Sequence, residues 1–348
     1  MLCADWRGRI LILKPSSLGD IVHALPVLSA LRRACPRSHI GWMVRTELAG
    51  ILECVGGLDE VLLFNRQALG RWYSLPGAGE LRTLIRKLRK GRYDIVLDLQ
   101  GLLRSALLAR ASGCPIRIGM DQAREGAGLF YTHSVPAPAS LHIIDYYKEI
   151  LALFGVKMEP VRFEIQPPVS ARQVVSELMD NEGLSGGRFA VLIPGSAHQK
   201  KCWPAERFAK VAEYLDQKAG LRIVAVGSQK ETDVVEKLIG STAVPIVNFA
   251  GRTTLPQLAA LLEKAAVAIG NDTGPVHLAA AMDVPTILIF GPTNPARVEP
   301  YQRPDAIAAL DPLDRGREAD NPDPKYRIEN VTLNAVIEKI RRLLPLSE

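Results

Sequence analysis

The segment RILILKPSSLGD, residues 9–20, decides the fold. Its first part, Arg9–Leu13, is almost wholly apolar and has the length of a buried strand. A loop of small residues follows, and an apolar pattern at helical spacing runs from Ile21 to Ala34. A strand that leads through such a loop into a helix predicts a corner suited to anions, because the first backbone N–H groups of a helix lack internal partners. The loop matches neither GxGxxG nor a phosphate-binding loop that ends in Lys-Ser/Thr.

Outward from this segment, short strands and helices alternate along the first half of the chain. Further strands are predicted over 39–44, 60–64 and 94–97, with helices over 80–90 and 142–154. A second series begins at Phe189, with strands over 189–193, 222–226, 267–270 and 286–290 and helices over 205–218, 231–238, 255–264 and 276–282. Alternation of this kind predicts an α/β protein with parallel, doubly wound sheets, whose ligands lie at the carboxyl ends of the strands.

The chain length of 348 residues suggests two domains. Two prolines in Gln166–Ser170 indicate a linker, so we expect domains over 1–168 and 169–330. A last helix, Leu333–Leu344, has an apolar face that could pack on either domain.

Composition excludes several protein classes. Apolar residues make up 47% and charged residues 23%, which is typical of a globular protein and not of a disordered one. The first apolar run, Ile10–Leu13, is too short for a signal peptide, and no run is long enough to span a membrane, so we expect a cytoplasmic protein. The net charge of +6 and the pI of about 9.1 favour an anionic partner.

Asp20 closes the first small-residue loop. In one interpretation it only caps the following helix. In the other it is a general base at the edge of the sheet. The residue pattern alone leaves both open.

Three small-residue loops follow strands of the second series. Pro194-Gly195-Ser196 precedes Lys201, which could neutralise a phosphate or simply be an exposed lysine. In the segment 271–277, Asp272 and Thr273 are expected to cap a helix whose N–H groups face a phosphate, with His277 one turn inside. Together with 290–293, these loops predict a nucleotide-diphosphate site.

Metal ligation and nucleic-acid binding are not indicated. No two aspartates stand at i and i+2, so the DxD metal clamp is missing, and we expect no metal. From Arg66 to Arg92 there are eight Lys/Arg and one acid, Glu80. This basic segment is either a solvated helix face or a contact for an anionic surface or lipid headgroup. Only Trp72 and Tyr73 are aromatic there, too few for a platform that stacks bases.

Four motifs carry a resemblance to a known family. They are Ser16-Ser17-Leu18-Gly19-Asp20-Ile21, Asp98-Leu99-Gln100-Gly101-Leu102, Lys201-Cys202-Trp203-Pro204 and Asp272-Thr273-Gly274-Pro275-Val276-His277. In order and spacing the chain resembles the lipopolysaccharide heptosyltransferases, glycosyltransferase family 9, from about residue 9 to 300. The pieces 119–121, 123–125 and 128–131 resemble the type I members.

The resemblance implies a GT-B fold, in which two Rossmann-like doubly wound domains face a central cleft. The first domain would bind the acceptor and the second the donor, with the C-terminal helix, 331–348, packing back on the first. The implied donor is ADP-heptose and the implied acceptor is Kdo-lipid A, at the cytoplasmic face of the inner membrane. The implied transfer of L-glycero-D-manno-heptose inverts the anomeric carbon and needs neither metal nor cofactor, and peripheral membrane contact is expected.

The resemblance also assigns residues. Asp20 matches the general base. The donor would be bound by Ser196, Lys201, Glu231 (ribose hydroxyls), Thr253 (adenine pocket), Asp272, Thr273, Gly274 and His277. The acceptor would be bound by Ser17, Gly19, Arg66, Arg71, Gln100 and Arg124.

Three alternatives remain open from the sequence. A GT-B sugar-nucleotide epimerase would act on the donor alone. A heptosyltransferase of type II would use a heptose acceptor. A non-catalytic nucleotide-binding protein at a membrane would need no base such as Asp20.

Overall fold

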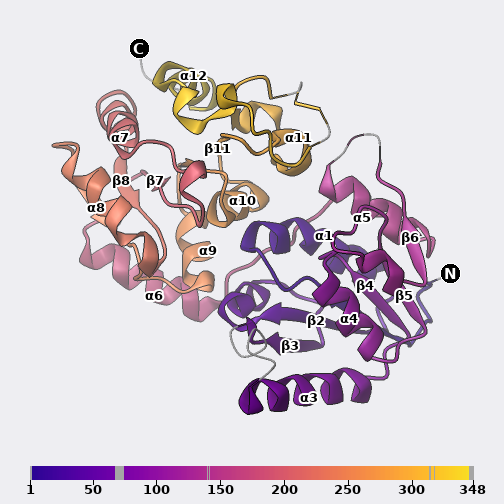
Figure 1. Ribbon diagram of the computed structural model, residues 1–348. Coiled ribbons are helices and arrows are strands. Elements are labelled where there is room, and N and C mark those ends of the chain that lie inside the picture. Colours follow the sequence, from indigo (N-terminus) through magenta and orange to yellow (C-terminus); the bar gives the residue numbers. More distant parts are fainter. Residues whose placement is uncertain are drawn as a thin grey trace. The chain divides into compact units, whose positions relative to one another are not determined.

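The computed structural model describes residues 2–66, 74–138, 140, 142–312, 315–316 and 318–344. It divides into two compact units, Met1–Glu164 and Ile165–Glu348 (Figure 1). The division lies four residues before the one expected at 168/169. The last two residues of the predicted linker are the first two of helix α6 (Val169–Asn181). This helix packs on α9 (Leu255–Glu263) and so belongs to the second unit.

Unit 1 is built on a six-stranded parallel sheet with the order β3-β2-β1-β4-β5-β6. Its strands are β1 (Arg9–Leu13), β2 (His39–Arg45), β3 (Glu60–Phe64), β4 (Ile95–Asp98), β5 (Ile116–Met120) and β6 (His133–Val135). The helices are α1 (Leu18–Ala34), α3 (Leu75–Lys90), α4 (Leu103–Ala111) and α5 (Ile143–Ala152). Helix α1 packs on α5 and α3 packs on α4, so the two pairs cover opposite faces of the sheet.

Unit 2 repeats this topology. Its strands are β7 (Phe189–Ile193), β8 (Arg222–Ala225), β9 (Ile246–Asn248), β10 (Val267–Asn271), β11 (Thr286–Ile289) and β12 (Ile307–Ala308), in the order β12-β11-β10-β7-β8-β9. Besides α6 and α9, its helices are α7 (Ala205–Ala219), α8 (Thr232–Gly240), α10 (Gly274–Ala281), α11 (Pro295–Val298) and α12 (Leu333–Leu343). Numbered within its own unit, each sheet has the order 3-2-1-4-5-6 of a Rossmann domain.

Short 3₁₀ helices complete the connections. They are η1 (Thr46–Cys54), η2 (Ala127–Phe130), η3 (Gln199–Lys201), η4 (Gln229–Glu231), η5 (Pro304–Ala306), η6 (Pro324–Tyr326) and η7 (Ile328–Asn330). Among the described residues no helix is both long and apolar enough to cross a bilayer.

The apolar residues of the strands form the core of each unit. In unit 1, Leu11 and Leu13 of β1 pack with Leu84 and Leu88, the buried positions of α3. In unit 2, Phe208 of α7 belongs to the corresponding cluster beneath β7 and β8. All eight strands predicted from the sequence are present, with each end within one residue of the expected one.

Helix α12 packs on α7, β11 and β12, which are elements of unit 2. Its buried residues Val336 and Ile340 join the apolar cluster of that unit, together with Leu344. This differs from the expectation that the helix packs back on the first domain. The physical reason is that the apolar face of α12 is buried against α7, β11 and β12 of unit 2.

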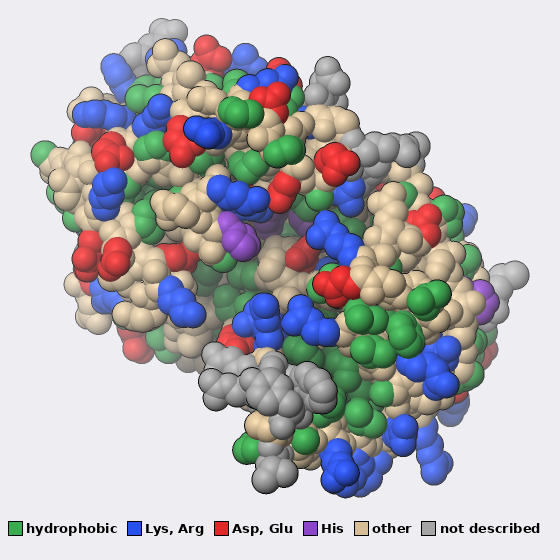
Figure 2. Space-filling model, in the orientation of Figure 1, with side chains coloured by type: hydrophobic (Ala, Val, Ile, Leu, Met, Phe, Trp, Pro, Cys, Tyr) green, Lys and Arg blue, Asp and Glu red, His purple; other side chains and the backbone are tan. Residues whose placement is uncertain are grey.

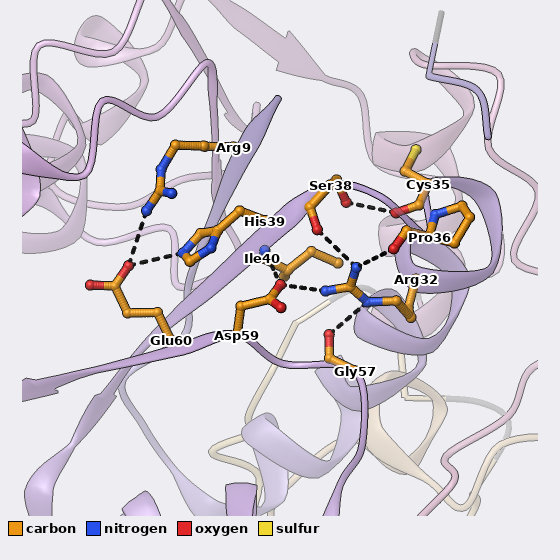
Figure 3. Close-up of polar contacts among 10 residues, drawn as sticks. All are labelled: Arg9, Arg32, Cys35, Pro36, Ser38, His39, Ile40, Gly57, Asp59 and Glu60. Atoms are coloured by element: carbon orange, nitrogen blue, oxygen red, sulfur yellow. Dashed lines mark hydrogen bonds and ion pairs between the residues drawn. The ribbon is translucent and has the colours of Figure 1, made fainter. Parts of the chain in front are cut away.

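Polar side chains close the edge of the first sheet where β1, β2 and β3 begin (Figure 3). The Glu60 carboxylate lies 3.4 Å from the guanidinium of Arg9 and 3.1 Å from Nε2 of His39. Beside it, Asp59 accepts a hydrogen bond of 2.5 Å from Arg32 of α1. These contacts hold the strand starts and α1 together, at the edge opposite to the one where the predicted site residues lie.

Candidate active site

Most of the predicted site residues follow the two central strands of each sheet, where the strand order reverses. In unit 1 they follow β1 and β4, which pair in parallel at the centre of the sheet. In unit 2 they follow β7 and β10, which pair in the same way. This switch point, at the carboxyl ends of the strands, is where α/β proteins bind ligands.

Asp20 lies in the first turn of α1. Ser17 is the N-cap of the helix, and Asp20 is three residues further on. One carboxylate oxygen of Asp20, Oδ2, accepts hydrogen bonds from the backbone N–H of Ser17 (2.8 Å) and from its hydroxyl (2.7 Å). The side chain is nevertheless 39% exposed. Asp20 therefore supports the helix start from the third helical position and not as the N-cap that the structural interpretation expected. It is also accessible, as a general base must be.

Lys14 lies beside Asp20, although the sequence assigned it no function. Its ammonium Nζ lies 3.9 Å from Oδ1 of Asp20 and donates to the carbonyl of Leu99 at 2.8 Å. The side chain is only 4% exposed. The signal that could have found it is a lysine placed directly after an apolar strand, where the alternation of the sheet leaves little access to water.

Asp98 and Gln100 hold the loop after β4 against the Asp20 loop. The buried Asp98 carboxylate accepts from the N–H groups of Gln100 (3.0 Å) and Gly101 (3.2 Å) and from the Tyr131 hydroxyl (2.8 Å). Burial raises the pKa of Asp98, against the lowering effect of these hydrogen bonds. The Gln100 side chain in turn accepts from the N–H of Ser16 at 3.2 Å. Gln100, which the resemblance assigned to the acceptor, therefore contacts the first loop.

Arg66 faces a hollow at the same edge of the sheet. The residues that line it include Ser16, Gln100, Arg66 and two arginines that the sequence reading missed, Arg45 and Arg104. Arg45 ends β2, and a cation at the carboxyl end of a strand was the available signal. Arg104 lies in α4, a helix that the sequence reading did not predict. Three guanidinium groups make this hollow suited to an anion.

The remaining predicted acceptor residues are placed as follows. Gly19 is buried in the first turn of α1. Arg124 is exposed after β5, and its backbone N–H donates to the carbonyl of Gly101 at 2.9 Å. Arg71 lies outside the described residues.

Lys201, Asp272 and His277 come together in unit 2. The Lys201 ammonium lies 2.6 Å from Oδ2 of Asp272, and Nε2 of His277 lies 3.0 Å from Oδ1. The Asp272 side chain is 6% exposed. Burial alone would raise the pKa of Asp272, but the hydrogen bond with His277 and the charge of Lys201 hold it well below its usual range. Asp272 is therefore an ionised anchor that fixes a lysine and a histidine.

Asn271 fixes the backbone around this cluster. Its side-chain oxygen accepts from the N–H of Trp203 at 2.9 Å, and its side-chain nitrogen donates to the carbonyl of Pro194 at 2.6 Å. The loops after β7 and β10 are therefore tied to each other by a buried amide. The positions of Lys201 and Asp272 follow from this tie.

The start of α10 differs in one detail from the expectation. Thr273 is the N-cap, but its side chain makes no capping hydrogen bond, and Asp272 binds Lys201 and His277 instead of capping the helix. The backbone N–H groups of Thr273 and Gly274 precede the first internal hydrogen bond of the helix, from Val276 to Thr273 at 3.1 Å. An anion at this point would meet these groups and the positive end of the helix dipole.

Glu231, Ser196 and Thr253 lie further along the same edge. A Cβ on Gly195, the neighbour of Ser196, would come within 2.6 Å of the Glu231 carboxylate, so the loops after β7 and β8 are in contact. Thr253 is partly buried two residues after Gly251, whose N–H donates to the carbonyl of Gly227 at 2.9 Å. The loop after β9 thus adjoins the loop after β8. In the sheet order β10-β7-β8-β9, the predicted donor residues form one row.

Among the described residues, no group of three or more His, Cys, Asp or Glu side chains is placed to hold a metal ion.

Comparison with known proteins agrees with this geometry. The family model described as glycosyltransferase family 9 (heptosyltransferase) matches residues 81–325. The chain belongs to this family. It is therefore a glycosyltransferase, and its two Rossmann-like units are those of the GT-B fold.

Individual relatives cover most of the chain. Lipopolysaccharide heptosyltransferase 1 of Pseudomonas aeruginosa is 31% identical over 302 residues, which are 85% of this chain and 82% of the relative. Lipopolysaccharide heptosyltransferase 3 of Escherichia coli is 26% identical over 79% of this chain and 81% of the relative. The structure of E. coli heptosyltransferase WaaC with ADP-2-deoxy-2-fluoro heptose is similar with a TM-score of 0.76 and 26% identity, covering 96% of this chain and 99% of that one.

Proposed function

We propose that this family 9 enzyme transfers L-glycero-D-manno-heptose from ADP-heptose to the Kdo region of the lipopolysaccharide inner core, with inversion and without a metal. The observation that carries the proposal is the chemistry at the two switch points. Unit 1 presents an accessible carboxylate, Asp20, and unit 2 presents a lysine and a helix start. A base for an alcohol and a site for a diphosphate are the two requirements of this reaction.

The row of loops in unit 2 supports a nucleoside diphosphate as the donor. The diphosphate would meet Lys201 and the N–H groups of Thr273 and Gly274. Glu231, one loop further, would accept hydrogen bonds from the ribose hydroxyls. Its Oε2 accepts from the N–H of Ser228 at 2.7 Å, and this contact holds the carboxylate in the loop after β8. Thr253, one loop beyond, would line the adenine pocket. The order phosphate, ribose, base thus follows the strand order β10-β7-β8-β9.

In the proposed step, Asp20 takes the proton of the acceptor hydroxyl as its oxygen attacks the anomeric carbon. The bond from that carbon to the β-phosphate oxygen breaks, and its electron pair leaves with ADP. Lys201 and the start of α10 stabilise the added negative charge. Attack from the side opposite to ADP inverts the anomeric carbon. The relatives named heptosyltransferase 1 and the solved complex with an ADP-heptose analogue support this choice of donor and acceptor.

The hollow of unit 1 supports an anionic acceptor. Arg45, Arg66 and Arg104 would bind the carboxylate or phosphate groups of the Kdo-lipid A region, with Gln100 and Arg124 nearby. No cofactor enters the step.

Helix α3 supports peripheral contact with the inner membrane, at its cytoplasmic face. The helix and Arg92, which follows it, carry six Lys or Arg residues and one acid, Glu80. The resulting charge of +5 is nearly the whole net charge of the chain, which is +6. Figure 2 shows Lys and Arg side chains gathered over the part of unit 1 that carries this helix. The cations are Arg82, Arg86, Lys87, Arg89, Lys90 and Arg92, and none forms an ion pair with a described residue. Such a surface attracts anionic headgroups.

The test combines binding and turnover. Calorimetry with ADP, GDP and UDP should show tight binding of ADP alone, and tight UDP with weak ADP would overturn the donor. NMR of ADP-heptose should show transfer only when Kdo-lipid A is added. Conversion of the donor by itself would indicate an epimerase, and transfer to a heptosylated acceptor alone would indicate a type II enzyme.

The Asp20→Ala variant separates catalysis from binding. It should lower transfer by a factor of about 10² to 10⁴ while ADP affinity stays near the wild-type value. Unchanged transfer would remove Asp20 from the role of base.

A further inference from the structure

Lys14 is a charged side chain in a place where charge is costly. Its side chain is 4% exposed, and it has two neighbours, the carbonyl of Leu99 at 2.8 Å and Oδ1 of Asp20 at 3.9 Å. Burying an ammonium is expensive unless an opposite charge lies near it. The hydrogen bond from Lys14 to the Leu99 carbonyl joins the ends of β1 and β4, and a neutral donor could make the same bond. The positive charge itself therefore calls for a separate explanation.

Asp20 is the group that this charge acts on. Its Oδ2 accepts two hydrogen bonds from Ser17, and its Oδ1 faces Lys14. All three contacts favour the ionised carboxylate over the protonated one. An ionised carboxylate is what a general base requires before the acceptor hydroxyl arrives.

Other titratable groups also lie near Asp20. Asp98, at the end of β4, carries a negative charge when ionised and so favours protonation of Asp20. Tyr147 of α5 is buried, and burial together with the charges of Asp20 and Asp98 raises its pKa well above the usual value. His23, one turn after Asp20, stacks edge-on with His142 at 5.9 Å between ring centroids. Lys14 is a buried cation that pairs with Asp20.

We propose that Lys14 is a positioning residue for the transfer reaction: its buried ammonium, anchored on the Leu99 carbonyl, holds Asp20 ionised and oriented while the exposed part of the carboxylate remains open to the acceptor. This inference rests on the proposed role of Asp20 as base and adds a second residue to it. Ser17 holds Oδ2 through hydrogen bonds, and Lys14 acts on Oδ1 through charge. The carboxylate is thereby fixed from two sides.

The test is the pH profile of kcat/KM for Lys14→Gln. Glutamine can still donate to the Leu99 carbonyl but carries no charge. Without the ammonium, the pKa of Asp20 rises, so more of the base is protonated at any acidic pH. The acid limb should move to higher pH by about one unit, with activity lost at low pH and largely recovered at high pH. ADP affinity should stay within about twofold of the wild type, because the donor residues are untouched.

Two further variants separate the charge of Lys14 from other effects of its replacement. Lys14→Arg retains the charge and should keep the wild-type acid limb, even if kcat falls. Lys148→Gln removes a lysine of α5 that pairs with Asp145 at 3.2 Å, and it should leave the profile unchanged. An unshifted limb in folded Lys14→Gln, or a limb shifted in Lys14→Arg, would overturn the inference. If Asp20→Ala also kept its activity, the proposed base itself would fail, which is a different result.

Discussion

The Lys201 ammonium lies 2.6 Å from Oδ2 of Asp272. The lysine that the sequence assigned to a phosphate is thus paired with a carboxylate of the protein itself. Asp272 in turn is held by His277 at 3.0 Å. A lysine fixed in this way loses little conformational entropy when a diphosphate binds. The site is therefore preorganised for the diphosphate, and the entropic cost of binding is small.

The substitution Asp272→Asn should destabilise unit 2 in a pH-dependent manner. Because the folded pKa of Asp272 lies below its usual value, the carboxylate contributes stability above about pH 4, and this contribution is lost as the pH falls toward the folded pKa. We expect a loss of about 3 kcal/mol in the free energy of unfolding at pH 7. The difference from the wild type should shrink below pH 4 in denaturant titrations followed by circular dichroism.

Asp283→Asn provides the matched control. Asp283 is 83% exposed and pairs with Arg303 at the surface. Its loss should change the free energy of unfolding by less than about 0.5 kcal/mol. Equal effects of both substitutions would contradict the special position of Asp272.

The substitution Gly195→Ala should weaken ADP binding although no donor residue is replaced. The new Cβ would lie 2.6 Å from the Glu231 carboxylate and would displace it from the site. Loss of a hydrogen bond to a charged group should lower ADP affinity about tenfold in calorimetry. In a Glu231→Ala background the same change should add little, since the displaced group is already gone.

Gly240→Ala is the control for this prediction. Gly240 ends α8, and a Cβ there meets nothing within 4 Å. ADP affinity should stay at the wild-type value. A tenfold loss in both variants would indicate a general effect on folding and not a displaced Glu231.

The sequence predicted the parts of the fold that have a clear apolar pattern. Eight strands and the two-unit α/β architecture follow from runs such as Arg9–Leu13 and Phe189–Ile193. Strands β6 and β12 have three and two residues, too few for any periodicity, and β6 falls in a stretch that reads as irregular. The placement of α12 also failed, because its amphipathic face fits any apolar surface and the choice between units depends on tertiary contacts.

For the site, the sequence located the loops but not their side-chain partners. Asp20, Lys201 and His277 were proposed because motifs carry them. The contact of Lys201 with Asp272, 71 positions away, depends on the pairing of β7 with β10. The anchoring of Lys14 on the Leu99 carbonyl, 85 positions away, depends on the pairing of β1 with β4. Arg45 and Arg104 belong to no motif, and only the geometry of the hollow joins them to Arg66.

The substitutions Arg66→Gln and Arg104→Gln should each raise the KM for an anionic acceptor. Each removes one guanidinium from the hollow, and a hydrogen bond to a charged group contributes enough for about a tenfold change. The KM for the donor should not change. Steady-state kinetics with varied acceptor measure this, and Arg110→Gln, on the exposed side of α4, should behave as the wild type. A changed donor KM in the first two variants would place these arginines in the other site.

The double substitution Arg86→Gln/Lys90→Gln should weaken binding to anionic vesicles. Each cation near an anionic surface contributes about 1 kcal/mol, so losing two should lower partitioning about thirtyfold at low salt. Co-sedimentation with phosphatidylcholine vesicles containing 30% phosphatidylglycerol measures this, with pure phosphatidylcholine as the uncharged reference. Lys218→Gln/Lys230→Gln removes the same charge from exposed positions of unit 2 and should bind as the wild type.

The same pair of variants decides whether the surface serves the reaction. With Kdo-lipid A in vesicles, Arg86→Gln/Lys90→Gln should transfer heptose more slowly than the control pair. With a soluble acceptor that lacks the acyl chains, both should match the wild type, because α3 contributes no residue to the hollow or to the Asp20 loop. Equal rates on vesicles would contradict a membrane role for α3. Tight binding of single-stranded DNA without binding of vesicles would assign the surface to a nucleic acid instead.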